Sequence, residues 1–233
     1  MGIPQSFLAM LSYTYRKENK LTPLNLNNSM PTAIVWFNGP SVKQFYNIPP
    51  QECEIGCNFI LDHRKVHHVC CYDKPTMDII DKKEKAKDVT YWTRKIFAKE
   101  GQWNIIKHID PHFKQIKDMN LHAKRLKKIL SLPYHCSGTL ALVIAYMLGA
   151  EKCILLGCDW TITNASVYDE QYKWRRFRPI KHNSEKIALI TKLSSLMELT
   201  IVHTNHKRPF GPQVKWITPA EFAEGHNINM AQE

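Results

Sequence analysis

Long uninterrupted apolar runs are absent from this 233-residue chain. A membrane-spanning helix needs about 18 such residues in a row, whereas the longest apolar stretch, residues 140–148, is about half that length. We also expect no signal peptide, because the apolar residues 7–11 are few and no basic residues precede them. We therefore expect a cytoplasmic protein without a transmembrane segment.

Several familiar motifs are missing as well. The chain has no G-x-G-x-x-G or Walker A loop, no G-x-S-x-G nucleophile motif and no paired His-Glu metal helix. It has no C-x-x-C knuckle either, so an ordinary zinc site is not expected, and we predict no bound metal. Most of the seven cysteines have apolar neighbours, which is typical of free thiols in a core; they are Cys53, Cys57, Cys70, Cys71, Cys136, Cys153 and Cys158.

The composition is that of an ordinary globular protein with an excess of positive charge. Hydrophobic residues make up 44% and charged residues 23% of the chain, which excludes a disordered, collagenous or coiled-coil protein. The formal net charge is +11, and residues 81–130 and 171–181 carry local surpluses of +8 and +5. Such basic segments attract phosphates, whether on a nucleotide, a nucleic acid or an anionic lipid surface. The sequence does not indicate an oligomeric state.

Apolar runs of strand length alternate with helical patterns along the chain. This order is typical of a mostly parallel sheet with helices on both faces, a three-layer α/β/α arrangement. We expect an irregular lead-in over residues 1–30 and a single α/β domain over residues 31–233. Strands are predicted at 32–37, 54–58, 66–72, 104–109, 153–158 and 199–204. Helices are predicted after residue 41, over 77–83, 113–130 and 138–148, and from residue 184.

Ligands of such sheets sit beyond the carboxyl ends of the strands, so the polar residues that follow strands are candidates for a site. They are residues 38–41, Asn58, Asp73, Asp159 and residues 203–205. The loop Asn38-Gly39-Pro40-Ser41 leads from a strand into a helix, and its backbone N–H groups can receive an anion. Ser137, as an N-cap, and Gly138 repeat this arrangement at the start of the apolar helix, where they could hold phosphate or ribose or serve only as a cap.

Two further residues could carry chemistry. Asp159 follows the strongest predicted strand and could bind a ribose, orient a substrate hydroxyl, act as a base or simply cap a loop. His182 lies between the basic segment 171–181 and the following helix. Because histidine exchanges a proton near neutral pH, it is the candidate general base.

These motifs, in this order, resemble those of the bacterial sialyltransferases of glycosyltransferase family 42. The resemblance extends over residues 32–205. It is carried by Phe37-Asn38-Gly39-Pro40-Ser41, Cys57-Asn58-Phe59, Tyr72-Asp73-Lys74-Pro75, Ser137-Gly138-Thr139-Leu140-Ala141, Ile154-Leu155-Leu156-Gly157-Cys158-Asp159-Trp160 and Lys181-His182-Asn183-Ser184.

The resemblance implies a Rossmann-like nucleotide-binding domain that transfers a sugar from a CMP-sugar to a glycan hydroxyl. The reaction would be an inverting displacement without a metal or other cofactor, with His182 as the base and Asp159 in the catalytic site. The nucleotide-binding residues it implies are Asn38, Gly39, Pro40, Ser41, Asn58, Asp73, Ser137, Gly138 and Asp159. Its partners would be a nucleotide-sugar donor and a glycan acceptor.

The chain departs from this family after the strand-end aspartate. Family members have two tyrosines there that steady the leaving phosphate, whereas this chain has Thr161 and, as an approximate counterpart of the second, Tyr168. We expect Tyr168, Arg175 and Arg176 to contact the phosphate or the acceptor, since an arginine can bind phosphate in place of a tyrosine.

Two other functions fit parts of the sequence. A nucleic-acid-binding protein on the same fold would use the basic patches and the aromatic residues of segment 171–181 to stack on bases. A phosphoryl-transfer enzyme similar to the pterin pyrophosphokinases would need carboxylates for magnesium, and Asp73 and Asp159 are the obvious candidates.

Overall fold

The computed structural model describes residues 32–83, 86–93, 104–105, 136–148, 150–159, 168, 181–204 and 210–226. Its framework is one sheet of eight strands in the order β5-β4-β3-β2-β1-β6-β7-β8. Every neighbouring pair of strands is parallel, which confirms the expected sheet. The strands are β1 (Thr32–Trp36), β2 (Glu54–Cys57), β3 (His68–Cys70), β4 (Thr90–Thr93), β5 (Asn104–Ile105), β6 (Lys152–Leu156), β7 (Glu198–Val202) and β8 (Val214–Ile217).

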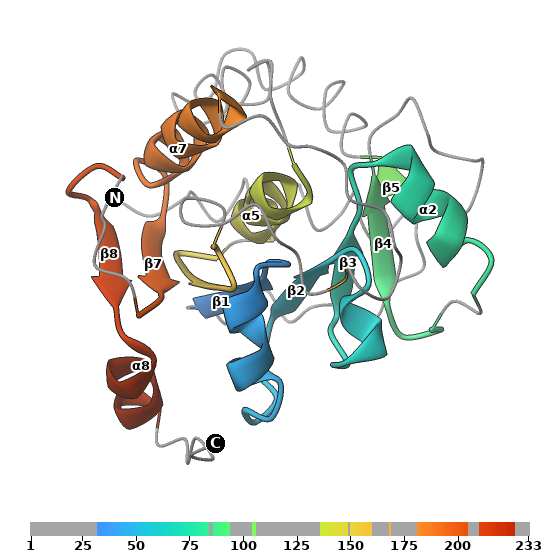
Figure 1. The fold of residues 1–233 in the computed structure, drawn as a ribbon, viewed down its shortest axis with the longest axis horizontal. Coiled ribbons are helices and arrows are strands. Elements are labelled where there is room, and N and C mark those ends of the chain that lie inside the picture. Colours follow the sequence, from blue (N-terminus) through green and yellow to red (C-terminus); the bar gives the residue numbers. More distant parts are fainter. Residues whose placement is uncertain are drawn as a thin grey trace, which may run out of the picture.

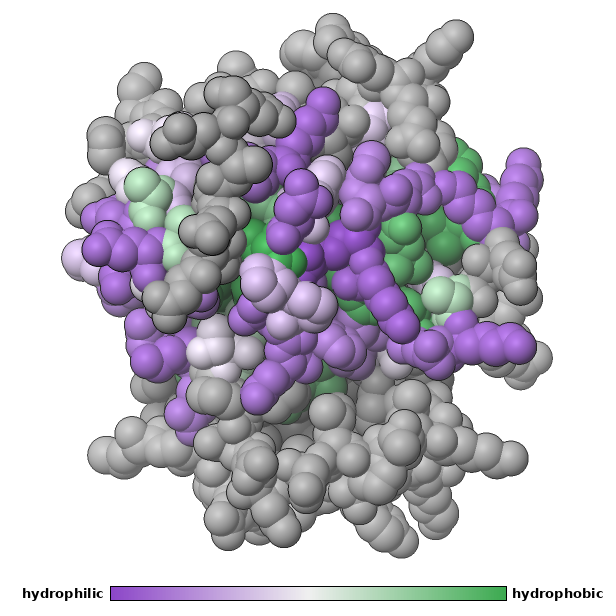
Figure 2. Space-filling view, turned by 90° about the horizontal axis from the view of Figure 1, so that it is seen from below, coloured by the Kyte–Doolittle hydropathy of each residue, from purple (hydrophilic) through white to green (hydrophobic). Residues whose placement is uncertain are grey.

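Helices cover both faces of the sheet, as expected of a Rossmann-like fold. The helices α5 (Ser137–Met147) and α7 (Lys181–Leu193) lie on one face, and the 3-10 helix η1 (Pro40–Phe45) and helix α8 (Pro219–Gly225) lie on the other (Figure 1). The remaining helices are η2 (Ile60–Asp62) and α2 (Lys74–Ile80). On the face seen in Figure 2, hydrophilic side chains cover much of the described surface and apolar atoms show between them.

The alternation of side chains along β1 explains why residues 33–36 are all apolar. Ala33 and Val35 belong to the core under α5 and α7, whereas Ile34 and Trp36 belong to the core of the opposite face, with η1, η2, α2 and α8. Successive side chains of a strand point to opposite faces, so a strand covered on both sides needs apolar residues at every position. None of the helices in the described ranges combines the length and apolarity that a bilayer span requires.

Several boundaries and elements differ from the prediction. The strands β6 and β7 begin one residue earlier and end two residues earlier than predicted, and β3 is shorter at both ends. Helix α2 begins at Lys74 with Pro75 in its first turn, and α7 begins at Lys181 instead of residue 184. The elements β4, β8, η2 and α8 were not predicted, because their apolar residues are too few for a run of strand or helix length. The expected lead-in 1–30 and helix 113–130 lie outside the described residues.

The cysteines are free thiols, as predicted. Six of the seven are buried, and Cys136 is partly exposed. Burial raises the pKa of the Cys57 and Cys70 thiols well above the usual value, and the neighbouring thiols add to this effect. These thiols are therefore inert core groups.

A buried ion pair joins β2 to the segment that follows η2, and its arginine also binds the loop that follows η1. The guanidinium of Arg64 donates to both carboxylate oxygens of Glu54, at 2.6 and 2.7 Å. Its other N–H groups donate to the backbone oxygens of Tyr46, Ile48 and Pro49. The indole nitrogen of Trp36 donates to Glu54 at 2.9 Å, and the guanidinium lies 4.5 Å from the centre of the Trp36 ring.

We expect Glu54→Gln to lower the free energy of unfolding by about 3 kcal/mol, because it leaves the buried Arg64 charge without its carboxylate. Urea unfolding followed by tryptophan fluorescence measures this change. The exposed neighbour Glu52 provides the matched control, and Glu52→Gln should change stability by less than about 0.5 kcal/mol. A loss at Glu54 as small as that at Glu52 would contradict a structural role for this pair.

A second buried polar group makes stability depend on pH. His68 lies on β3 with its Nδ1 atom accepting from the indole of Trp92 at 3.3 Å, which requires a neutral ring. Burial, with a smaller contribution from the charge of His67, lowers the pKa of His68 to about 3. Since the unfolded chain binds this proton near pH 6.5, the neutral ring stabilises the fold above pH 6.5, and that contribution is lost as the pH falls toward 3.

We expect the free energy of unfolding to fall by about 3 kcal/mol between pH 7 and pH 4 on account of His68 alone. Urea unfolding of the wild type and of His68→Gln across this range isolates the contribution, because the variant lacks the titrating group. The same substitution at the exposed His63 should leave the wild-type pH dependence in place. If the free energy of unfolding varied with pH in the same way for the wild type and His68→Gln, His68 would not titrate as described.

Candidate functional site

The strand order places the candidate site between β1 and β6. The chain proceeds from β1 to β2 on one side and from β6 to β7 on the other, so the connections diverge at this point. In open parallel sheets, ligands bind in the crevice beyond the carboxyl ends of the strands at such a switch point. The segments that leave β1 and β6 here are residues 37–41 and 157–159. We call the carboxyl edge of the strands around this point the switch edge.

Asp159 ties the two sides of the switch edge together. Asp159 is 3% exposed, and its carboxylate accepts hydrogen bonds from the backbone N–H of Ser41 at 2.6 Å and from the Ser41 hydroxyl. The Nε2 atom of His203, just after β7, lies 3.3 Å from the same carboxylate. Three chain segments that are distant in sequence therefore meet at one buried side chain.

The hydrogen bonds of Asp159 decide its charge state. Burial by itself raises the pKa of this carboxyl group, but donation from His203 and from Ser41 outweighs burial and leaves the pKa below its ordinary value. Both carboxylate oxygens already accept hydrogen bonds, so this geometry suits an anion that positions the loop after β1. A carboxylate that acts as general base near neutral pH would instead have a raised pKa.

Glycines allow the backbone to approach Asp159. A Cβ atom on Gly39 would lie 2.4 Å from the carboxyl carbon of Asp159, closer than side chains tolerate. Gly157 has a φ of +72°, a conformation that glycine adopts without strain, and its carbonyl accepts from the N–H of Gly39 at 2.9 Å. The turns after β1 and β6 are therefore fixed against each other.

A second polar cluster lies beside the first at the ends of β2 and β3. The hydroxyl of Ser137 donates to the side-chain oxygen of Asn58 at 2.8 Å and accepts from the backbone N–H of Tyr72 at 3.0 Å. Asn58 has a φ of 55°, an uncommon conformation for a residue other than glycine. The start of α5 is thereby joined to the ends of two strands.

The position of Ser137 corrects one prediction. The N-cap of α5 is Cys136, and Ser137 is the first residue of the helix. The backbone N–H of Cys136 donates to the hydroxyl of Thr139 at 2.9 Å, so threonine provides the side chain of the cap. Gly138 does allow a close approach, because a Cβ atom there would lie 2.0 Å from the ring of Phe37. The start of α5 thus packs directly against the residue that follows β1.

Asn38 lies at the end of β1 with an unsatisfied polar atom. Its side-chain oxygen is buried and accepts no hydrogen bond from the described groups. Leaving such a group unpaired costs about 1–3 kcal/mol, so a buried acceptor without a partner is a candidate for contact with a ligand. Asn38, Ser41, Asn58, Ser137 and Asp159 all follow or contact the ends of β1, β2, β3 and β6, so the structure brings these predicted residues to one edge.

Three other predicted residues take no part in these two clusters. Asp73 is exposed as the N-cap of α2, and Pro40 is the exposed first residue of η1. Tyr168 is buried in the core of the face opposite α5, where its ring contacts Phe59 edge-on and stacks on His63. Burial raises the pKa of its hydroxyl far above the usual value. In this conformation Tyr168 packs as a core side chain.

Three predictions fall wholly or partly outside the described part. His182 lies in the first turn of α7, but its side chain is not among those described. Arg175 and Arg176, together with the whole segment 171–180, lie outside the described residues.

His203 is the residue of the switch edge that sequence reasoning did not single out. The signal was its place directly after a buried strand, within the region 203–205 that we expected to border the site. Its ring is buried, its carbonyl accepts from the indole of Trp216 at 3.2 Å, and its N–H donates to Ile217 at 3.0 Å. Its nearness to Asp159 depends on the pairing of β7 with β6 and could not be predicted from sequence spacing.

The carboxylates that a magnesium site would need are far apart. Asp73 follows β3 and Asp159 follows β6, and three strand spacings separate these ends, which amounts to roughly 14 Å. Within the described ranges, no group of three or more His, Cys, Asp or Glu side chains is arranged to hold a metal ion. This geometry does not favour the phosphoryl-transfer alternative.

Comparison with known proteins gives a likeness in structure only. No family model and no curated protein matches the chain. Among solved structures, it is similar to the sialyltransferase CstII from Campylobacter jejuni in complex with cytidine-5'-monophosphate, with 15% identity, coverage of 88% of this chain and 86% of that chain, and a TM-score of 0.45. It is also similar to the monofunctional alpha-2,3-sialyltransferase Cst-I from Campylobacter jejuni, with 16% identity, 85% coverage of each chain and a TM-score of 0.45.

Both of these proteins are bacterial sialyltransferases, the group whose motifs the sequence resembles. A likeness at these identities concerns the course of the chain and not its chemistry.

We expect Asp159→Asn to lower the free energy of unfolding by about 2–4 kcal/mol and Ser41→Ala by about 1–2 kcal/mol, because each removes a hydrogen bond that involves a charged, buried group. The double variant should lose less stability than the sum of the two single losses, by about 1 kcal/mol or more. Urea unfolding of the four proteins measures this coupling. Asp88→Asn, at a side chain that is 81% exposed, is the control for the loss of a carboxylate. Fully additive losses would show that Ser41 and Asp159 stabilise the fold independently.

Proposed function

We propose that this protein is a nucleotide-sugar-dependent glycosyltransferase, similar to the bacterial sialyltransferases, that transfers a sugar from a CMP-sugar to a glycan hydroxyl. The observation that carries the proposal is the meeting of two polar clusters at one switch edge. Ser41 and Asp159 form the first, Asn58 and Ser137 form the second, and the unsatisfied oxygen of Asn38 lies at the end of β1. This edge is where the fold binds nucleotides.

The residues of the switch edge have groups suited to a nucleotide. The side-chain amide of Asn38 can exchange hydrogen bonds with a base or a ribose, as can the side chains of Asn58 and Ser137. The first N–H groups of α5 have no partner within the helix and favour an anion such as a phosphate. Asp159 orients Ser41 and the loop before it, so its role is to position the residues that touch the nucleotide.

The proposed chemistry is a direct displacement that inverts the anomeric carbon. His182, as general base, takes the proton of the acceptor hydroxyl while that oxygen bonds to the anomeric carbon. The bond from this carbon to the phosphate oxygen breaks, and CMP leaves with the electron pair. Donors near the phosphate offset the negative charge that develops there. No step in this scheme requires a metal, and we propose that the reaction proceeds in the presence of a chelator.

We expect CMP, with EDTA present, to raise the melting temperature by about 5 °C or more at a concentration 100-fold above its Kd, since binding to the folded state then contributes about 2.7 kcal/mol. Asn38→Ala should bind CMP about 10-fold more weakly while leaving the unliganded protein as stable as the wild type or more so, because it removes an unsatisfied buried acceptor. Calorimetric titration and thermal unfolding measure both quantities. The exposed Asn47 provides the control, and Asn47→Ala should leave both unchanged.

The proposed role of His182 as general base can be tested by measuring sugar transfer separately from CMP binding. With CMP-sialic acid as donor and free glycans as acceptors, His182→Ala should lose transfer by a factor of 100 or more while its CMP affinity stays within about twofold of the wild type. The absence of any stabilisation by CMP would refute the proposed function. Normal transfer by His182→Ala would refute only the role of His182.

A further inference from the structure

The imidazole of His203 contacts the buried anion of the switch edge. Its Nε2 atom lies 3.3 Å from Oδ1 of Asp159, the oxygen that also accepts from the Ser41 hydroxyl. Because a carboxylate is an acceptor only, we assign the proton of this contact to Nε2. The ring donates in this way both as the neutral tautomer with a proton on Nε2 and as the imidazolium. A side chain at the end of β7 therefore donates to the same oxygen as the loop after β1.

Strand β8 holds His203 in place. The register pairs Leu156 of β6 with Val202 of β7, and His203 is the first residue beyond this pair. Its N–H donates to the carbonyl of Ile217 at 3.0 Å, and its carbonyl accepts from the indole nitrogen of Trp216 at 3.2 Å. The centres of the His203 and Trp216 rings lie 6.0 Å apart. The outermost strand of the sheet thus supports both the backbone and the ring of His203.

The charge of Asp159 depends on the groups that donate to it. Burial disfavours a charged carboxylate, and the backbone N–H of Ser41, the Ser41 hydroxyl and His203 offset that cost. An anionic Asp159 takes the only hydrogen of the Ser41 hydroxyl, so the oxygen of Ser41 remains an acceptor for other groups. A protonated Asp159 would itself donate and could reverse the direction of that hydrogen bond. The contact from His203 therefore favours one position of the loop and one polarity of Ser41.

We propose that His203 is a positioning residue for nucleotide binding, a role that rests on the proposed function and assigns a task to the end of β7. It acts through Asp159, because Nε2–H holds the carboxylate and the carboxylate holds Ser41 and the loop that contains Asn38. In this proposal His203 does not touch the nucleotide and takes no proton in the reaction. The nucleotide binds the fraction of molecules in which the loop is correctly placed, so a less firmly held loop lowers the affinity.

Two substitutions of His203 separate the hydrogen bond from the packing of the side chain. His203→Met keeps a buried side chain but has no donor, so calorimetric titration should give it an affinity for CMP about 10-fold below that of the wild type. Glutamine can place an amide N–H near the position of Nε2, so His203→Gln should bind CMP within about threefold of the wild type. A role in packing alone predicts no recovery in His203→Gln. Each variant is titrated at a temperature at which circular dichroism shows it to be folded.

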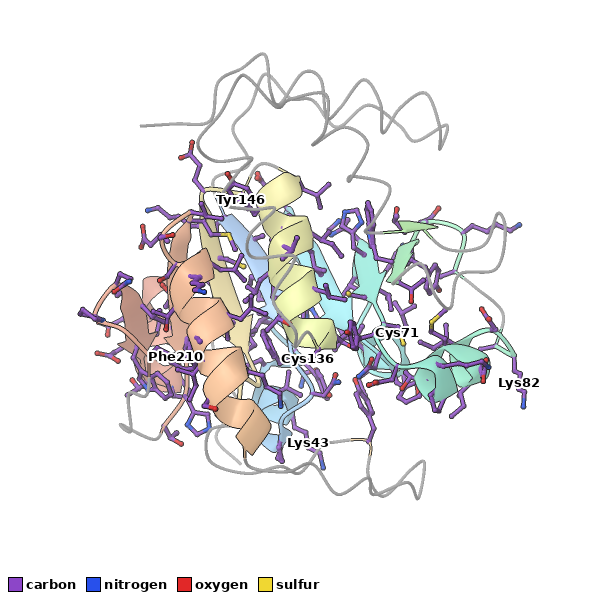
Figure 3. The ribbon with its side chains drawn as sticks, turned by 90° about the horizontal axis from the view of Figure 1, so that it is seen from above. Lys43, Cys71, Lys82, Cys136, Tyr146 and Phe210 are labelled. Atoms are coloured by element: carbon purple, nitrogen blue, oxygen red, sulfur yellow. The ribbon has the colours of Figure 1, made fainter. Side chains whose placement is uncertain are left out.

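His68 provides the matched control at the opposite edge of the sheet. Like His203 it is 7% exposed and accepts a hydrogen bond from an indole, but it is the first residue of β3. Cys136 at the start of α5 and Lys43 of η1 lie toward the end of the molecule that contains the switch edge, whereas Tyr146 lies toward the other end (Figure 3). His68→Met should bind CMP within about twofold of the wild type although it is less stable. An equal loss of affinity in His68→Met and His203→Met would refute a specific role of His203.

The route through Asp159 can be tested in the Asp159→Asn variant. The charge that His203 holds is already absent there, so adding His203→Met should weaken CMP binding by less than about threefold further. If His203→Met instead caused its full loss of affinity in this variant, His203 would act on the nucleotide by another route, and the proposal would be overturned.

The possible outcomes distinguish this inference from the proposed function. If the wild type binds CMP and His203→Met binds it equally well, the role of His203 is refuted and the proposed function stands. If the wild type does not bind CMP, both are refuted. Should His203→Met not fold, His203→Asn takes its place, because its amide is one carbon shorter than that of glutamine and does not reach the position of Nε2. Weaker binding by His203→Asn than by His203→Gln supports the proposal, and equal affinities overturn it.

Discussion

The hydrogen bonds between Asp159 and Ser41 hold together the two strand ends on which the candidate site depends. They join the turn after β6 to the turn after β1, which are 118 residues apart in sequence. The turns themselves are built for this contact, because Gly39 leaves room for the carboxylate and Gly157 adopts a left-handed conformation beside it. The side chain of His203 extends the same arrangement to β7. The buried anion thus adds to the backbone hydrogen bonds of Phe37 and Gly39 in fixing the loop that contains Asn38.

Two buried polar networks in this protein differ in how completely they are satisfied. In the network of Glu54 and Arg64, both carboxylate oxygens and the guanidinium N–H groups have partners. Such a network stabilises a loop and has no capacity left for a ligand. At the switch edge, in contrast, Asn38 keeps a buried acceptor without a described partner. This difference in satisfaction, more than the presence of polar residues as such, distinguishes the candidate site from a structural network.

The sequence allowed the central strands to be predicted because they are covered on both faces and are therefore apolar at their last four positions. This holds for β1 and β6, and the loops after them could be identified as parts of a site. The four-residue strand β8 alternates buried and exposed residues at the margin of the sheet, and so short a pattern does not stand out from its surroundings. The partners of Asp159 come from segments that are distant in sequence. A serine at the start of a helix suggested a cap, yet the tertiary bonds of Ser137 with Asn58 and Tyr72 determine its place.

Asn58 combines a left-handed backbone conformation with a side chain that accepts a hydrogen bond from Ser137. Its left-handed backbone would be most relaxed in a glycine, so replacement by glycine is the change that optimisation of thermal stability would suggest for this position. A glycine would nevertheless leave the hydroxyl of Ser137 without its acceptor at the start of α5. Asparagine is among the few residues that tolerate this conformation and also present an acceptor. The backbone of this position therefore favours glycine, whereas the hydrogen bond from Ser137 favours asparagine.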